Sequence, residues 1–245
     1  MSNTKPSRYH KECAGCKRSA DDNEISRVNT AGTVDTVQTT GPSAPYRSLA
    51  NPAPLGLAGF AFTTFVLGLI NLQTQSVKVP NIVVGPAIAY GGVTQFCAGM
   101  WEMAIGNTFG ATALASYGAF WVSYAIILIP GSGVSAAYPE TADFNHAMGF
   151  FMMGFFIFSV FLTLCTMRTT AFLCLLFCLV DVTFLLLSLS NFLTGPDGSP
   201  HQELSRVGGA FAMLASFTAW YIMYAGMANN KNRFEIRLEI ASKFF

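Results

Sequence analysis

The chain has 245 residues, of which 52% are hydrophobic and 11% are charged, and its formal net charge is +1. Soluble domains carry about 25% charged residues. Of the 14 basic and 13 acidic residues, 18 lie in residues 1–50 and 229–245. The middle of the chain therefore has too few charges for a water-exposed surface, which excludes a soluble globular protein. The balanced charge gives no indication of a nucleic-acid partner.

Residues 1–50 form a polar tail without an apolar run, so no cleavable signal peptide is expected. Ser, Thr, Asp, Asn and Lys dominate it, a composition typical of disorder. Cys13 and Cys16 form a C-x-x-C pair in this tail, but no second cysteine or histidine pair at zinc spacing accompanies it. We therefore predict a disordered N-terminal tail without a metal site.

The first apolar segment begins with an unusual proline-containing stretch. Proline is excluded from a helix interior but suits the first turn, so the stretch predicts a rigid approach to a helix that starts near Pro54. A helix N-terminus offers free backbone N–H groups and a partial positive charge, which favour a carboxylate. We therefore expect a carboxylate site there, in a transporter or a channel. The stretch reads Asn51-Pro52-Ala53-Pro54-Leu55-Gly56-Leu57.

Five more apolar segments follow, each close to the length of about 20 residues that a helix needs to cross the hydrocarbon core. Turn-forming sequences with Pro, Gly or Asn separate several of them. The fold class that this pattern predicts is an all-α integral membrane protein with six transmembrane helices. The expected spans are Leu55–Leu72, Ile82–Met103, Phe109–Ile129, Ala147–Met167, Thr170–Phe192 and Val207–Ala228.

Charge asymmetry predicts the orientation of these spans. Six spans place both termini on one side of the membrane, and 11 of the 14 Lys and Arg residues lie in the two tails. The positive-inside rule then puts both tails in the cytoplasm. We expect a cytoplasmic tail at residues 1–50, a transport domain at 51–228 and a second cytoplasmic tail at 229–245.

Helical spacing sorts the embedded polar residues into stripes. Each stripe fits a transport pathway, but a hydrogen bond to a neighbouring helix also explains the glutamine, and a core or interface position also explains the tyrosines. The stripes on the second and third spans are Gln95, Gly99 and Glu102, then Tyr117, Trp121 and Tyr124.

Two acidic residues are candidates for proton coupling, because ionisable groups inside a membrane commonly mark pathways or proton relays. Asp181 lies in the middle of the fifth span, and the other spans contain no Lys or Arg to pair with it. Glu102 lies near the end of the second span, so contact with lipid headgroups is the alternative for that residue.

Motifs of soluble enzymes are missing from the sequence. It contains no G-x-S-x-G, no P-loop and no H-E-x-x-H. We therefore expect no catalytic residue, no metal site and no cofactor, and a transporter rather than an enzyme.

Three segments, in the expected order, resemble the acetate uptake transporter family, the acetate/succinate–proton symporters of bacteria and fungi. The similarity covers about residues 51–228, and the sequence of the second segment is closest to the fungal branch. The segments are Asn51 to Leu57 with Gly59-Phe60 and Thr63-Thr64, Tyr90 to Glu102, and Gly106 to Trp121.

The resemblance implies a six-helix protomer that assembles as a homo-hexamer, with one pathway in each protomer. It implies small monocarboxylates as substrates, chiefly acetate, with succinate accepted by some relatives. It also implies a narrow hydrophobic constriction at Phe60, Tyr117 and Val180. The family usually has Leu at the last position, so the smaller Val180 is expected to admit larger acids.

The predicted function is therefore proton-coupled transport of acetate across a membrane, with the plasma membrane favoured. Protons, small carboxylates and the lipid bilayer are the expected partners. A passive anion channel and an ammonium or ammonia exporter remain alternatives, and a receptor or sensor fits the long tail. The expected substrate-binding residues are Asn51, Pro52, Ala53, Pro54, Leu55, Gly56, Thr63, Gln95, Asn107 and Thr108.

Overall fold

The computed structural model describes residues 25–28, 34–37 and 49–228, in two compact units that divide after Ser48. In the first unit, β1 (Ile25–Val28) and β2 (Val34–Val37) pair as an antiparallel two-stranded sheet. These strands lie in a tail for which the sequence predicted no regular structure. Val, Ile and Thr supply the strand preference there. The Cys13–Cys16 pair and the C-terminal tail from residue 229 lie outside the described residues.

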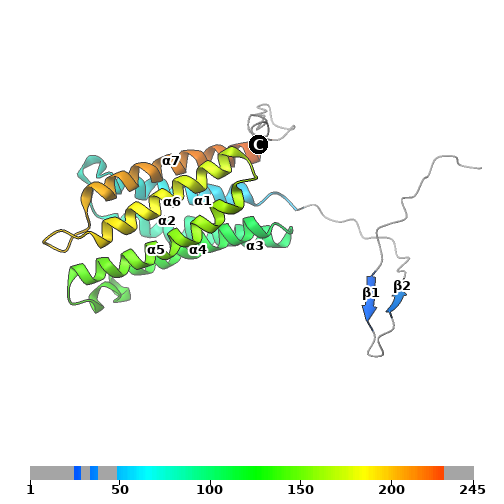
Figure 1. Cartoon of the computed structure of the whole chain (residues 1–245), viewed down its shortest axis with the longest axis horizontal. Coiled ribbons are helices and arrows are strands. Elements are labelled where there is room, and N and C mark those ends of the chain that lie inside the picture. The colour runs from blue at the N-terminus through cyan, green and yellow to red at the C-terminus, as the bar shows by residue number, and fades with distance from the viewer. Residues whose placement is uncertain (1–24, 29–33, 38–48, 229–245) are drawn as a thin grey trace, which may run out of the picture. The chain divides into compact units, whose positions relative to one another are not determined.

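The second unit is a bundle of long helices that run side by side (Figure 1). Six segments of the described chain are long and apolar enough to cross a membrane, as the sequence predicted. Five of them are single helices and one is broken. The single helices are α1 (Ala53–Asn71), α4 (Thr108–Leu128), α5 (Thr141–Thr166), α6 (Ala171–Phe192) and α7 (Gln202–Met227).

The second span is not the continuous α-helix that the sequence predicted. It is built from a 3₁₀ turn, two short α-helices and a π-helical segment between them. Pro86 lacks a backbone N–H and so removes one donor from the first of these helices. Gly91 lets the π-helical segment approach α1 closely, because a Cβ on this residue would clash with Thr63. The four pieces are η2 (Pro80–Val83), α2 (Val84–Ile88), η3 (Ala89–Thr94) and α3 (Gln95–Ala104).

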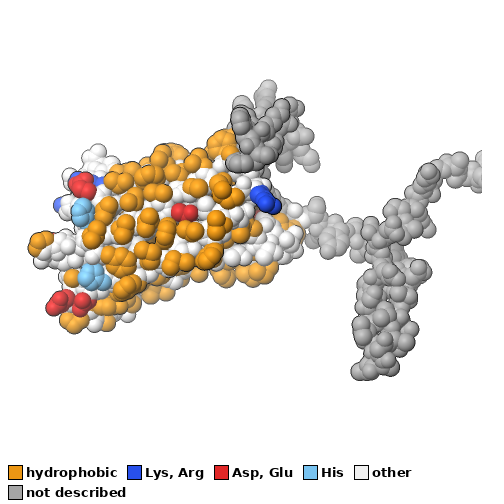
Figure 2. Space-filling view, in the orientation of Figure 1, with side chains coloured by type: hydrophobic (Ala, Val, Ile, Leu, Met, Phe, Trp, Pro, Cys, Tyr) orange, Lys and Arg blue, Asp and Glu red, His pale blue; other side chains and the backbone are white. Residues whose placement is uncertain are grey.

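The outer surface of the bundle is hydrophobic, and most of the visible charge lies at its two ends (Figure 2). Large apolar side chains such as Phe150, Phe161 and Leu164 are more than 60% exposed. In water such a surface would aggregate, whereas in a bilayer it faces lipid tails. The chain is therefore a multi-pass membrane protein.

Polar side chains contact one another at the end of the bundle where α7 begins. Arg206 pairs with Glu203 and also donates to the side chain of Gln73, which ties α7 to the turn after α1. The hydroxyl and backbone N–H of Ser199 donate to Asp197, and these hydrogen bonds hold the pKa of that carboxyl below its ordinary value. This loop therefore keeps its negative charge at neutral pH.

Candidate functional site

A cavity of about 210 Å³ lies inside the bundle at the end where α1, α4 and α6 begin. Its walls are almost entirely apolar, as in most small-molecule pockets. Ala53 and Asn107, at the first turns of α1 and α4, mark its outer part. The other residues that line it are Leu57, Phe60, Gln95, Phe109, Gly110, Ala113, Leu114, Tyr117, Leu173, Leu176, Phe177, Val180 and Ile222.

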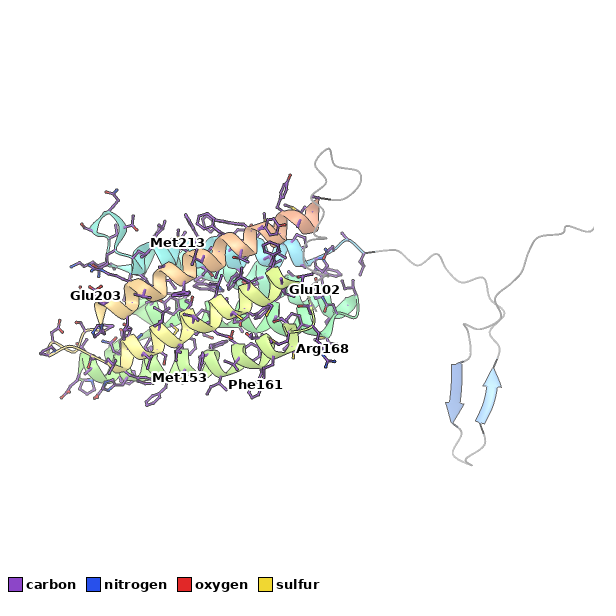
Figure 3. All side chains as sticks on the ribbon, turned by 45° about the horizontal axis from the view of Figure 1, so that its top comes forward. Glu102, Met153, Phe161, Arg168, Glu203 and Met213 are labelled. Atoms are coloured by element: carbon purple, nitrogen blue, oxygen red, sulfur yellow. The ribbon has the colours of Figure 1, made fainter. Side chains whose placement is uncertain are left out.

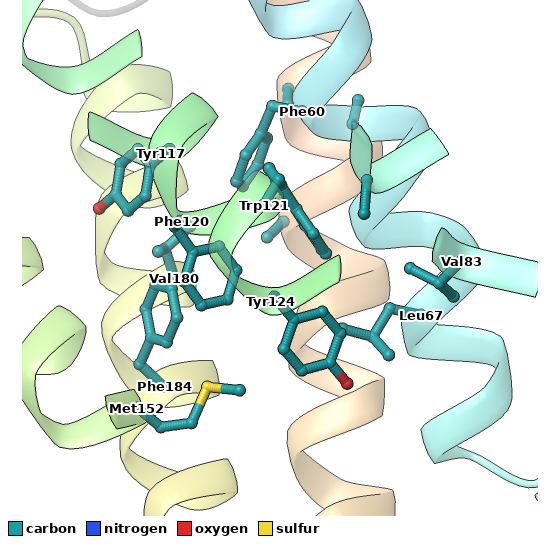
Figure 4. Packing of buried hydrophobic residues seen from close by; sticks show 14 of the residues in the cluster. Phe60, Leu67, Val83, Tyr117, Phe120, Trp121, Tyr124, Met152, Val180 and Phe184 are labelled. Carbon is teal, nitrogen blue, oxygen red and sulfur yellow. The ribbon is translucent and has the colours of Figure 1, made fainter. Parts of the chain in front are cut away.

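The three residues expected to form a constriction all line this cavity. Phe60, Tyr117 and Val180 come from α1, α4 and α6, and each is at least 93% buried. The rings of Phe60 and Tyr117 are tilted by 49° relative to each other, with centroids 6.0 Å apart (Figure 4). The structure therefore brings together three residues that lie more than 50 positions apart in the sequence.

Beyond these residues the interior is filled by aromatic rings. Phe184 stacks on Tyr117 at 6.2 Å, and Phe120 meets Phe184 edge-on at 5.1 Å (Figure 4). The hydroxyl of Tyr117 donates to Ser159 of α5 at 2.7 Å, which fixes the direction of the ring. Neither Phe120 nor Phe184 lines the cavity. The cavity is thus open toward one end of the bundle and closed toward the other.

Gln95 is the most deeply buried polar residue that lines the cavity. Its side chain has 0% relative exposure, and neither amide atom has a hydrogen-bond partner among the described residues. Buried polar groups are normally paired, so an unpaired amide needs an explanation. A Cβ on Gly118 would lie 2.7 Å from the backbone nitrogen of Phe96, the residue after Gln95. Gln95 therefore lies at the level of Tyr117, at the inner end of the cavity.

The expected carboxylate site at the start of α1 has no free backbone donor in its first turn. Pro52 and Pro54 have no N–H, and the N–H of Ala53 donates to the side chain of Asn51 at 3.1 Å. The N–H groups of Leu55 and Gly56 both donate to the carbonyl of Pro52. The prediction of free donors here is wrong. The prolines lack an N–H, and the Asn51 side chain and the Pro52 carbonyl occupy the N–H groups of Ala53, Leu55 and Gly56.

The buried Glu102 and the exposed Asn107 form a polar pair at the junction of α3 and α4. The amide of Asn107 donates to Glu102 Oε2 at 2.6 Å, while Asn107 Oδ1 accepts from the backbone N–H of Gly110. Glu102 is 1% exposed, and its Oε1 has no partner among the described residues. Figure 3 shows Glu102 near the same end of the bundle as Arg168, with Glu203 at the other end. Glu102 itself does not line the cavity, but its partner Asn107 does.

Asp181 lies outside the cavity, between α6 and α5. Its Oδ2 accepts from Thr163 at 2.6 Å, and its Oδ1 has no partner among the described residues. No salt bridge reaches it within the part of the chain that the structure describes. The Thr163 hydroxyl also lies 3.1 Å from the carbonyl of Ser159, which competes with Asp181 for its single hydrogen. The hydroxyl of Ser159 accepts from Tyr117, so Asp181 is connected to Tyr117 only indirectly.

Several residues that the sequence predicted to bind substrate do not line the cavity. Thr63 donates to the carbonyl of Gly59 and does not line the cavity. Leu55 is 50% exposed on the outside of the bundle, and Thr108 is also exposed. Pro54 and Gly56 are buried against α7 and α4 as packing residues. Pro52, like Asn51, lies before α1 and is not part of the cavity wall.

Most of the apolar wall was not identified from the sequence. On α6, Leu173, Leu176, Phe177 and Val180 line the cavity together. They recur at three- and four-residue spacing, so helical periodicity alone could have grouped them with Val180. The same spacing occurs along much of α6, however, and only the packing of α1, α4 and α7 selects this face.

Residues 34–241 match the family model described as the GPR1/FUN34/yaaH family. The chain belongs to this family. The match covers all of the transmembrane bundle, including every residue of the cavity. The resemblance inferred from the three sequence segments is thereby confirmed.

Acetate permease A of Emericella nidulans is 47% identical over 199 residues, 79% of this chain and 67% of the relative. Ammonia transport outward protein 2 of Saccharomyces cerevisiae is also 47% identical, over 78% of this chain and 66% of the relative. The chain thus spans about two thirds of the length of these fungal proteins.

The succinate-acetate/proton symporter SatP of Escherichia coli is 39% identical, over 75% of this chain and 91% of the relative. A solved structure of the bacterial acetate channel SatP superimposes with a TM-score of 0.65 at 31% identity, over 75% of this chain and 95% of that chain. The names of these relatives describe transporters or a channel rather than enzymes.

Proposed function

We propose that this chain transports acetate and related small carboxylates, with succinate as a further candidate, across the membrane together with protons. The observation that carries the proposal is the cavity that Phe60, Tyr117 and Val180 line together. Its size and apolar wall fit a small molecule with a short hydrocarbon part. The names acetate permease and succinate-acetate/proton symporter among the relatives support the same substrate class.

In this proposal, the polar groups of the cavity hold the carboxyl end of the substrate. Asn107 lies at the mouth and Gln95 at the inner end, and both are neutral. Phe60 and Tyr117 limit the bore and remove hydration water, since a hydrophobic constriction admits only a dehydrated solute. The proton travels either on a side chain, for which Glu102 and Asp181 are the candidates, or on the substrate itself.

We further propose that both tails are cytoplasmic, that the protein is in the plasma membrane, and that it forms a homo-hexamer with one pathway per protomer. The cavity then opens toward the cytoplasm. Surface labelling of tags added at each terminus checks the orientation: protection of both tags in intact cells is expected. Chemical cross-linking in the native membrane checks the assembly, with a ladder ending at six protomers expected.

Uptake of labelled acetate decides whether transport is coupled to protons. The assay uses cells that lack their own carrier, at about pH 5 and about pH 7, where carboxylic acids differ in ionisation, with and without a protonophore. We expect accumulation above equilibrium that the protonophore abolishes. Saturable uptake that only equilibrates would instead indicate a passive channel, which is what the solved bacterial relative is called.

The Asn51→Asp variant tests the role of the cavity mouth. Aspartate keeps the side-chain oxygen that accepts from Ala53, so this hydrogen bond before α1 is retained. The added negative charge lies two residues from the cavity wall and repels the acetate anion that dominates near neutral pH. If acetate enters as the anion, transport at about pH 7 should fall about fivefold, the factor for roughly 1 kcal/mol of repulsion. Entry of the undissociated acid should be unaffected by this charge.

Asn81→Asp is the matched control for Asn51→Asp. Asn81 is an exposed asparagine in η2, away from the cavity, so the same charge change there should leave transport unaltered. Normal acetate transport by a correctly localised Asn51→Asp variant would show that no acetate anion passes Asn51.

Export of ammonia is the second candidate, because one relative of equal identity is named an ammonia transport outward protein. Acidic residues at the far end of the bundle, Glu140 and Asp143, would attract a cation there. Two results together would favour this candidate over the first. Cells with the protein at the membrane would show no flux of labelled acetate, and their release of ammonia would depend on the protein.

A further inference from the structure

We propose that the cavity binds the undissociated carboxylic acid rather than the anion, and that it therefore also transports small primary amides such as acetamide. The inference rests on the proposed function, since it names the chemical form of the substrate at the same site. It predicts a second class of solute that carries no charge and no titratable proton.

The unpaired amide of Gln95 is the first observation. The side chain is fully buried, lines the cavity, and leaves both its carbonyl oxygen and its NH₂ group without partners among the described residues. Each unsatisfied buried group costs about 1–3 kcal/mol. A ligand that supplies one donor and one acceptor, side by side, satisfies both groups at once.

A carboxylate cannot do this, whereas a carboxylic acid can. The two oxygens of acetate are both acceptors, so the carbonyl of Gln95 stays unpaired when the anion binds. Acetic acid donates its O–H to Gln95 Oε1 while its carbonyl accepts from Gln95 Nε2. Acetamide offers the same pair of groups in the same arrangement, an N–H donor beside a carbonyl acceptor.

The charges around the cavity are the second observation. No Lys, Arg or His lines it among the described residues. Lys78 and Arg206 lie at the other end of the bundle. Arg168, in the loop between α5 and α6, lies at the same end as the cavity but does not line it. Glu102 accepts a hydrogen bond from Asn107, so the group beside this residue of the mouth is a carboxyl and not a cation.

The walls of the cavity increase this preference for a neutral solute. Moving an isolated ionised carboxylate into an apolar environment costs far more than moving a neutral polar group. The backbone N–H groups at the start of α1 do not compensate, since none is free in its first turn. Asn107 donates one amide N–H to Glu102 and accepts from Gly110, which leaves a single N–H of its side chain for a ligand.

This binding mode makes the transport proton-linked without a side-chain proton carrier. An undissociated acid that forms on one side and dissociates on the other moves one proton with each acetate. One proton and one acetate cross the membrane together, so no net charge is moved. The coupling then depends on the acid–base equilibrium of the substrate, and an amide that uses the same route needs no proton.

The test uses the full-length protein in liposomes, with influx of labelled acetamide and labelled acetate measured at about pH 5 and about pH 7. We expect saturable acetamide influx that is equal at the two pH values. Acetate influx should fall about tenfold for each unit of pH above the pKa of the acid. Each solute should inhibit the other, whereas N,N-dimethylacetamide, which has no N–H donor, should inhibit neither.

Gln95→Leu should reduce the influx of both solutes at least about tenfold, the factor for about 1.4 kcal/mol of lost pairing. Ser216→Ala is the matched control. Ser216 is also fully buried, but it donates to its own helix and does not line the cavity, so both fluxes should remain. The competition between solutes in the wild-type protein does not depend on whether either variant folds.

Acetate influx without acetamide influx or competition would overturn this inference and leave the proposed function standing. Acetate influx that follows the concentration of the anion would overturn it as well. If neither solute crosses, the proposed function fails together with the inference.

Discussion

Replacing Val180 with Phe is expected to reduce acetate transport at least about tenfold. Val180 faces Phe60 and Tyr117 at the inner end of the cavity and is 5% exposed. Phe177, one turn earlier on α6, already lines the same wall, so a second ring has no free space except the bore itself. One extra or missing methylene group in a hydrophobic pocket changes the discrimination between substrates by about 10–200-fold. The larger change from Val to Phe should therefore lower acetate transport by at least the lower figure.

Val182→Phe is the matched control, because Val182 lies on the same helix but does not line the cavity. Labelled acetate uptake, normalised to protein at the membrane, should fall for Val180→Phe and remain for Val182→Phe. Val180→Leu provides a graded step: it should lower the transport of larger acids relative to acetate. Unchanged selectivity in Val180→Leu would remove residue 180 from the constriction.

Replacing Phe60 with Ala is expected to have the opposite effect and to widen the route. Phe60 contributes one ring to the proposed constriction. Among the described residues, this ring contacts one other aromatic ring, that of Tyr117. Removal of this ring should therefore widen the route and leave the packing of Tyr117, Phe120 and Phe184 intact. We expect the uptake of larger carboxylates relative to acetate to rise about tenfold, measured as the ratio of labelled solutes.

Phe184→Ala separates this effect from a general loss of stability. Phe184 is as buried as Phe60 and stacks on Tyr117, but it does not line the cavity. Both variants remove a buried ring, which costs about 3–5 kcal/mol of folding free energy, so both should lower the thermal stability in detergent. Only Phe60→Ala should change the selectivity, and an equal change in both variants would contradict the assignment.

The helical bundle was predictable because its cause is local. Six long apolar segments are required by the hydrocarbon core, and no tertiary contact is needed to recognise them. The broken second span was not predictable in the same way. Pro86 and the pair Gly91-Gly92 are visible in the sequence, but the π-helical segment depends on how closely it packs against Thr63 and Trp121.

The candidate site was predictable only in part. Helical spacing put Gln95 and Glu102 on one stripe, and both are buried as that spacing indicates. Spacing along one helix does not say which stripe faces a cavity. Consequently the sequence could not distinguish Thr63, Leu55 and Asp181 from Gln95, although each of the three lies outside the cavity wall.

The sequence by itself determined the membrane class, the six spans and the family, because these depend on composition, length and short motifs. The tertiary structure decided which groups are free to act. It showed that the first turn of α1 has no unpaired donor, and that the amide of Gln95 is buried in the cavity wall without a partner among the described residues. Hydrogen bonds and cavities are formed between residues far apart in the chain, so only the packed bundle reveals them.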